Sequence, residues 1–133
     1  MSAVRASCAT SSGLDVHQTF VTMARSLYAD TVKWRAPARG IERIGRDEVI
    51  RHLLREASAM QEPEFTQLRR GVGERQIIDE YAVRFVYTGT GLDNAPIERG
   101  NLIELKRVRI LELEDGRVAL ETCVENWTVL TAQ

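Results

Sequence analysis

Apolar residues recur at helical spacing in two stretches of the first half of the chain. The first stripe predicts a helix over residues 15–29, and Asp15 and Gln18 stand at capping-box spacing near its start. The second predicts a helix that begins near Gly45 and stops before Pro63, with acids in its first turn. The two stripes consist of Val16, Phe20, Met23, Ala24 and Leu27, then Val49, Ile50, Leu53, Leu54, Ala57 and Met60.

Alternating apolar and polar residues fill most of the remaining chain and predict strands. A short strand over residues 31–36 ends at Pro37, and two more cover residues 65–72 and 76–88. The last two, residues 103–113 and 118–127, flank Asp115-Gly116, a strong hairpin signal. Residues 38–44 and 89–96 are expected to be loops.

The order of these elements is helix, strand, helix and then four consecutive strands. Strands that follow one another in this way favour an α+β fold with a mostly antiparallel sheet. The length of 133 residues suits one domain. Residues 1–13 are small and polar and are read as a disordered N-terminal arm, which leaves residues 14–133 as the single folded domain.

Composition excludes several classes of function. The net charge is −1 with both signs interspersed, which argues against a nucleic-acid or membrane surface, and no apolar run approaches the roughly 20 residues that span a bilayer. The two cysteines do not indicate a disulfide framework, so a cytoplasmic location is expected. The histidines and cysteines lack metal-site spacing and no phosphate-binding glycine loop is present, so neither metal nor cofactor is expected.

Several short motifs follow one another in a specific order and spacing. They are Leu27-Tyr28-Ala29-Asp30, Val32-Lys33-Trp34-Arg35-Ala36-Pro37, Gly45-Arg46-Asp47-Glu48-Val49-Ile50, Tyr87-Thr88-Gly89-Thr90, Gly100 and Asp115-Gly116-Arg117-Val118. Together they resemble the nuclear transport factor 2-like superfamily over residues 16–127, most strongly its SnoaL-like polyketide cyclase type. The resemblance implies a cone-shaped roll, in which a strongly curved sheet wraps around the N-terminal helices and leaves a pocket at its open end. It also implies a homodimer formed through the outer face of the sheet.

Catalytic positions of the resembled families carry other residue types in this chain. The position of the general base of ketosteroid isomerases is Ala36, and that of their oxyanion-stabilising acid is Arg109. The acid at the end of the last strand in SnoaL-type cyclases is replaced by Asn126, and Arg84 lacks the nearby Asp used by related hydrolases. Catalytic residues are therefore unknown. An acid such as Glu121 or Glu125 would reach the cone only if a bulge shifts the alternation by one residue.

A ligand site remains if the family's inward faces are assigned to these strands. Its expected residues are Trp34, Arg109, Thr122, Val124 and Asn126. Aromatic and aliphatic walls with one cation, one amide and one hydroxyl suit an apolar ligand that bears a carbonyl or carboxylate. The alternatives are that Arg109 lies on the surface and that Asn126 is an ordinary strand-end residue. His52 flanks the apolar stripe of its helix and is expected to be solvated.

Two functions follow from this interpretation. The first is a small-molecule-binding protein whose apolar pocket holds a carbonyl- or carboxylate-bearing ligand, with catalysis unproven. The alternative is a small cyclase, isomerase or hydrolase that acts on a polyketide- or steroid-like substrate. Fold alone does not decide between them.

Overall fold

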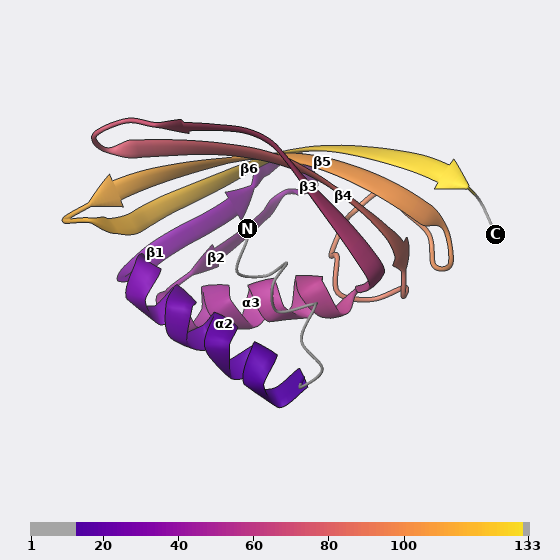
Figure 1. The fold of residues 1–133 in the computed structure, drawn as a ribbon, viewed down its shortest axis with the longest axis horizontal. Helices are drawn as coiled ribbons and strands as arrows, with labels where there is room; N and C mark the ends of the chain where they lie inside the picture. The colour runs from indigo at the N-terminus through magenta and orange to yellow at the C-terminus, as the bar shows by residue number, and fades with distance from the viewer. Residues whose placement is uncertain (1–12, 132–133) are drawn as a thin grey trace.

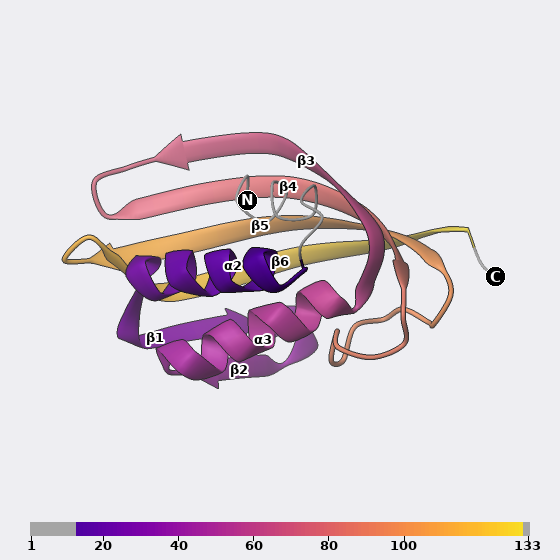
Figure 2. The same cartoon turned by 60° about the horizontal axis from the view of Figure 1, so that its bottom comes forward.

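The computed structural model describes residues 13–131, so the predicted arm lies outside the described residues apart from Gly13. Two helices lie together on one side of a broad sheet (Figures 1 and 2). In chain order the elements are α2 (Gly13–Leu27), β1 (Tyr28–Ala36), η1 (Pro37–Arg39), β2 (Ile41–Ile44), α3 (Arg46–Ser58), β3 (Met60–Val72), β4 (Gln76–Tyr87), β5 (Leu102–Glu114) and β6 (Arg117–Thr131).

The six strands form one sheet in the order β2-β1-β6-β5-β4-β3. The four C-terminal strands make an antiparallel meander, as their consecutive order predicted. The first strand, β1, pairs with β6 in parallel and with β2 antiparallel, so the sheet is mixed. The predicted α+β class with a curved sheet around N-terminal helices is confirmed. The strand β2 was expected to be loop.

The turn between β5 and β6 shows why Asp-Gly was a reliable signal. Asp115 has φ 51° and Gly116 has φ 76°, and Glu114 pairs with Arg117 across the turn. Positive φ at both central residues gives the turn the twist of the flanking strands. The turn therefore fixes the pairing of Glu114 with Arg117 and of Leu113 with Val118 at the start of the two strands.

A bulge in β6 changes which of its side chains face the helices. Leu113 pairs with Val118 but Glu112 pairs with Leu120, so Ala119 is an extra residue on this strand. Val118 is buried before the bulge, whereas the buried residues after it are Glu121 and Cys123. One added residue moves every later side chain to the opposite face. The inward face assigned to Thr122, Val124 and Asn126 is therefore wrong.

Two apolar clusters fill the space between the helices and the concave face of the sheet. One lies under α2 and α3 around Trp34, Val49 and Leu111, and the other lies along β4 and β5 around Val83, Phe85 and Leu105. The alternation of β4 left its Tyr81 and Phe85 face as either core or dimer interface, and both residues are buried in the second cluster. None of the helices among the described residues is long and apolar enough to cross a membrane.

Candidate functional site

Buried charged residues line the concave face beside α3. We call Arg39, Glu56, Arg107 and Glu125 the arginine–glutamate ring. Arg39 donates from Nε and Nη2 to the two oxygens of Glu125, at 2.8 and 2.9 Å, and from Nη2 to Glu56 at 2.7 Å. Arg107 donates from Nη2 to Glu56 at 3.1 Å and from Nε to Glu125 at 2.9 Å. The four side chains thus alternate in sign around a closed circuit.

Electrostatics keep the ring ionised despite its burial. Burial alone would raise the pKa of Glu56, but the charges of Arg107 and Arg39 and the nearby His52 hold that pKa well below its usual range. Burial would likewise lower the pKa of Arg39, and its contacts with Glu125 and Glu56 raise it instead. Two positive and two negative charges therefore cancel, which is the condition for tolerating buried ions.

A second group of buried polar residues, Tyr28, Asp79, Arg109 and Glu121, is called the inner cluster. Arg109 donates to both oxygens of Glu121, from Nε at 2.9 Å and from Nη2 at 3.3 Å, and its Nη1 lies 3.5 Å from Asp79. The hydroxyl of Tyr28 donates to Glu121 at 2.6 Å. The Arg109 guanidinium is therefore paired with protein carboxylates, so it does not serve as the anion-binding group for a ligand that the sequence predicted.

Burial and neighbouring charges fix the protonation states of Tyr28 and Glu121 in the inner cluster. Burial raises the pKa of Tyr28 and the adjacent Glu121 charge raises it further. Burial opposes ionisation of Glu121 as well, but Arg109 and the Tyr28 hydroxyl outweigh it and lower the pKa of Glu121. Burial also raises the pKa of the Cys123 thiol, so it lacks the thiolate character of a nucleophile. At neutral pH Tyr28 is therefore a neutral phenol beside the Arg109 guanidinium and the Glu121 carboxylate.

His52 and Trp34 pack against each other, and their buried ring nitrogens lack aligned hydrogen bonds. His52 is 4% exposed, contrary to the solvated position expected for it, and its ring packs on Trp34 with centroids 4.2 Å apart. Its Nε2 lies 3.2 Å from Glu56 but is not aligned for a hydrogen bond. Among the described residues, both His52 nitrogens and the Nε1 atoms of Trp34 and Trp127 are buried without hydrogen-bond partners. Unsatisfied buried donors of this kind cost free energy and call for an explanation.

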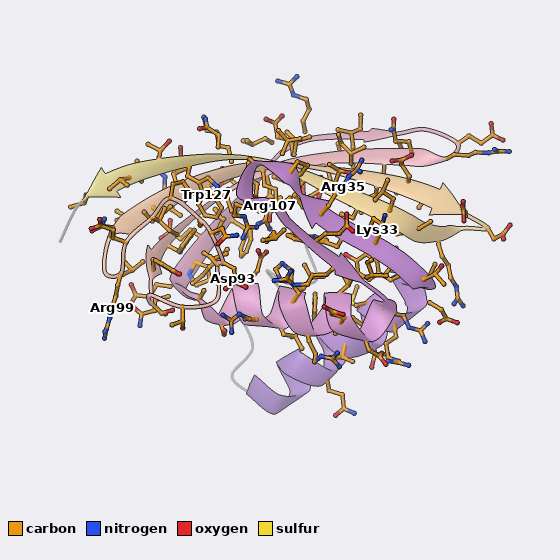
Figure 3. The ribbon with its side chains drawn as sticks, turned by 180° about the vertical axis from the view of Figure 1, so that it is seen from behind. Lys33, Arg35, Asp93, Arg99, Arg107 and Trp127 are labelled. Atoms are coloured by element: carbon orange, nitrogen blue, oxygen red, sulfur yellow. The ribbon has the colours of Figure 1, made fainter. Side chains whose placement is uncertain are left out.

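The guanidinium of Arg39 links the two tryptophans. Its central carbon lies 5.8 Å from the ring centroid of Trp34 and 5.5 Å from that of Trp127, within cation–π range. Figure 3 shows Trp127 and Arg107 between the sheet and α3, with Asp93 close to the end of that helix. The candidate site therefore consists of Trp34, His52 and Trp127 around the arginine–glutamate ring.

The structure brings together only part of the predicted site. Trp34 and Arg109 point to the interior as expected. Thr122 faces outward and accepts a hydrogen bond from Arg35 at 3.0 Å, Val124 is 54% exposed and Asn126 is exposed. The sequence interpretation missed Glu56 and His52, which lie four residues apart on one helix face, and it missed Glu125 because of the bulge. The i, i+4 spacing of His52 and Glu56 was the available signal.

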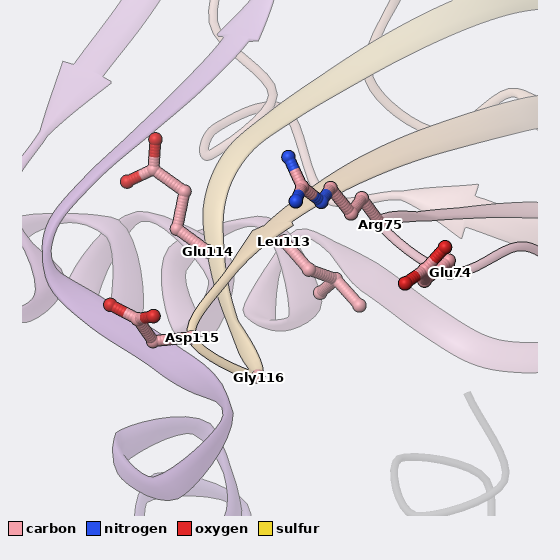
Figure 4. Close-up of a pocket in the computed structure, with 6 residues that line it drawn as sticks. All are labelled: Glu74, Arg75, Leu113, Glu114, Asp115 and Gly116. Carbon is pink, nitrogen blue, oxygen red and sulfur yellow. The ribbon is translucent and has the colours of Figure 1, made fainter.

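Two open depressions lie elsewhere on the molecule. One, of about 520 Å³, lies between the β3–β4 and β5–β6 turns (Figure 4) and is lined by Glu74, Arg75 and residues 113–116. The other lies on the outer face across β3, β4 and β5, beside the 2.8 Å ion pair of Arg84 with Glu104. Neither contains a predicted site residue. No group of described residues has the composition and geometry to hold a metal ion.

Comparison with solved structures identifies the architecture. A protein from Jannaschia sp. CCS1, assigned as a SnoaL-like polyketide cyclase, superposes with a TM-score of 0.66 and 12% identity over 84% of this chain and 72% of that one. The chain has the nuclear transport factor 2-like fold. An NTF2-like protein of unknown function from Cytophaga hutchinsonii gives a TM-score of 0.60 at 15% identity, over 79% of this chain and 84% of its own.

Other matches to this NTF2-like fold carry different functions. A steroid delta-isomerase from Pseudomonas aeruginosa has a TM-score of 0.58 at 18% identity, over 95% of this chain and 81% of that one. A phenazine biosynthesis-related protein from the same organism has a TM-score of 0.63 at 13% identity, over 82% and 70% of the two chains. No family model and no curated protein matches the sequence. Identities this low establish the fold alone.

Proposed function

We propose that this NTF2-like domain binds a small, mostly apolar molecule that bears a carbonyl or carboxylate, and that the molecule sits against Trp34 and His52. The observation that carries the proposal is the pair of buried indole N–H groups, on Trp34 and Trp127, that no described residue accepts. A carbonyl or carboxylate oxygen of the ligand would accept hydrogen bonds from these groups, whereas a protonated amine can only donate and would leave them unsatisfied. The apolar surroundings, Val49 and Ile50 among them, suit the remainder of such a ligand.

Arg109 has no part in this proposal. Its pairing with Glu121 and Asp79 leaves the indole and imidazole groups as the polar handles. The outward Thr122, Val124 and Asn126 are likewise set aside, since the sheet separates them from Trp34.

The test uses matched aromatic probes that differ only in a ketone, carboxylate or amine group, titrated calorimetrically. The ketone and carboxylate are expected to bind more tightly than the amine. Trp34→Phe keeps the ring and removes the N–H, so it should weaken binding about two- to tenfold, the value of one net hydrogen bond. The control Asn126→Ala should leave affinity unchanged. Preferential binding of the amine, or equal losses in both variants, would contradict the proposal.

An enzymatic alternative rests on His52 and Glu56. A histidine 3.2 Å from a carboxylate that stays ionised has the composition of an acid–base pair. This supports proton transfer next to the carbonyl of a bound ketone, as a cyclase or isomerase requires. In D₂O the protein should then catalyse deuterium exchange at that carbon, measured by NMR. His52→Gln should abolish exchange but retain binding, and an absence of exchange for every bound ketone would eliminate this alternative.

A further inference from the structure

The β4–β5 loop, residues 88–101, is built as a hinged segment. Gly89, Gly91 and Gly100 have φ values of 105°, 106° and 85°, a region that only glycine adopts without strain. The two ends of the loop are held together by the strand pair, with Tyr87 N donating to Asn101 O at 3.1 Å and Gly100 N to Tyr87 O at 2.8 Å. The ends are therefore anchored, and the glycines lie where a change of backbone direction would occur.

Two ion pairs and one hydrogen bond hold the tip of this loop against three other elements. The Asp93 carboxylate accepts from Arg55 of α3 at 2.9 Å and from Arg43 of β2 at 3.2 Å, and its backbone carbonyl accepts from Arg39 of η1 at 3.1 Å. Asn94 in turn donates to the carbonyl of Arg39 at 3.0 Å. A single acidic residue thus ties the loop tip to both α3 and β2.

Close packing accompanies the ionic contacts. Leu92 is 2% exposed and joins the apolar cluster of Phe85 and Leu105. A Cβ added to Gly91 would lie 2.6 Å from the Arg55 carbonyl, so the loop backbone rests directly on α3. Figures 1 and 2 show the loop at one end of the space between α3 and the sheet. The loop thus lies as a fitted cover over the C-terminal end of α3.

The cover is in direct contact with the candidate site through Arg39. That one guanidinium holds the Asp93 carbonyl, both ring carboxylates and the faces of Trp34 and Trp127. We propose that the β4–β5 loop is a gate over the Trp34–His52 site, and that Asp93 is its latch. The kind of molecule that passes the gate rests on the proposed function, whereas the opening and closing of the loop does not depend on it.

The ion pairs of Asp93 are the part of the gate that salt and competing anions can weaken. The side chains of Asp93, Arg43 and Arg55 are 34%, 25% and 55% exposed, whereas those of Arg39 and Glu125 are nearly inaccessible. Partly exposed ion pairs weaken as salt rises, while the buried ring resists screening. Salt, or an anionic group that competes for Arg43 and Arg55, should therefore release the loop and leave the ring intact.

The test measures access to Trp34 without any ligand. The chain has two tryptophans, so Trp127→Phe leaves Trp34 as the sole fluorophore. In that background Asp93→Asn should raise the acrylamide quenching constant about threefold, the scale of a partly exposed ion pair. High salt should raise quenching in the parent but add little in the variant. Asp30→Asn, which removes an ion pair with Arg46 at 3.0 Å, is the matched control and should have no effect.

Circular dichroism melting separates gate opening from unfolding. If Asp93→Asn does not fold, Arg43→Ala with Arg55→Ala removes the same latch from its other side and should give the same increase. Equal quenching in the latch and control variants would overturn the proposal, and so would salt dependence that persists after Asp93 is neutralised. A failure of ligand binding leaves these results unaffected, which keeps the two proposals distinguishable.

Discussion

Replacing Glu125 by glutamine should destabilise the domain severely, because its carboxylate lies between two buried arginines. Its side chain is inaccessible to solvent and accepts hydrogen bonds from Arg39 and Arg107 at 2.5–2.9 Å. With glutamine the ring would carry two positive charges against the single charge of Glu56. Breaking a buried pair by removing one partner costs about 3–5 kcal/mol, a large part of the roughly 5–15 kcal/mol that stabilises a domain.

Burial, rather than the count of ion pairs, sets this magnitude. Glu104→Gln is the matched control, since Glu104 accepts from Arg84 at 2.8 Å on the outer face, where Arg84 is 59% exposed. That substitution should cost about 0–1 kcal/mol. Urea denaturation with linear extrapolation measures both, because urea does not screen charge as guanidinium salts do. Equal losses in the two variants would refute the reasoning.

A double-mutant cycle extends the same test. Arg39→Met and Glu125→Met should each be strongly destabilising, whereas the pair together should cost less than their sum because no unpaired charge is left between them. Arg107 and Glu56 remain in the double variant and still balance each other. Additive losses would mean that the ring is not electrostatically coupled.

Three further outcomes are expected. The lowered pKa values of Glu56 and Glu121 contribute their full stabilisation above the usual carboxyl pKa of about 4.3. The free energy of unfolding should therefore stay level from pH 7 to about 5 and decrease as the pH falls below about 4.3. Equal stability at pH 3 and pH 7 would contradict this. We propose a homodimer through the outer sheet face, where the apolar residues Val124 and Ile78 are 54% and 43% exposed. Val124→Lys should convert the dimer to a monomer in sedimentation experiments, and a monomeric parent protein would exclude the dimer. Gly91→Ala should cost about 1–3 kcal/mol because of its φ and its contact with Arg55, whereas Gly71→Ala, with open space and ordinary φ, should not, as thermal melts would show.

The sequence pattern predicted the elements better than it predicted the faces. Asp115-Gly116 and the alternation of the last two strands were sufficient for the hairpin, and helical spacing was sufficient for α3. The alternation could not reveal the bulge, because Val118, Ala119 and Leu120 are all apolar and any of them reads as inward. Because of this one extra residue, Glu121, Cys123 and Glu125 face the helices in place of Thr122, Val124 and Asn126.

Buried charge was the second limit of sequence interpretation. Arg107, Glu121 and Glu125 read as solvated positions because isolated ions are rarely buried, and Arg109 was expected to point inward only as a contact for a ligand. Each is buried only because a partner from another strand or helix meets it, as Glu56 meets Arg107 across 51 residues of chain. Such pairing depends on tertiary geometry, and no local pattern encodes it. His52 was misplaced for the same reason, since Trp34 of β1 covers it.

The parallel pairing of β1 with β6 has a consequence for how the chain acquires this structure. Tyr28 pairs with Val118 and Arg35 with Thr122, so these contacts join positions separated by most of the sequence. During synthesis β1 has only the four-residue β2 as a strand partner until the last strand has been made, and closing so long a loop carries an entropic cost. Contacts of such sequence separation slow folding. The meander of β3 to β5 can assemble earlier, whereas the N-terminal half must wait for the C-terminal strand to give it a place in the sheet.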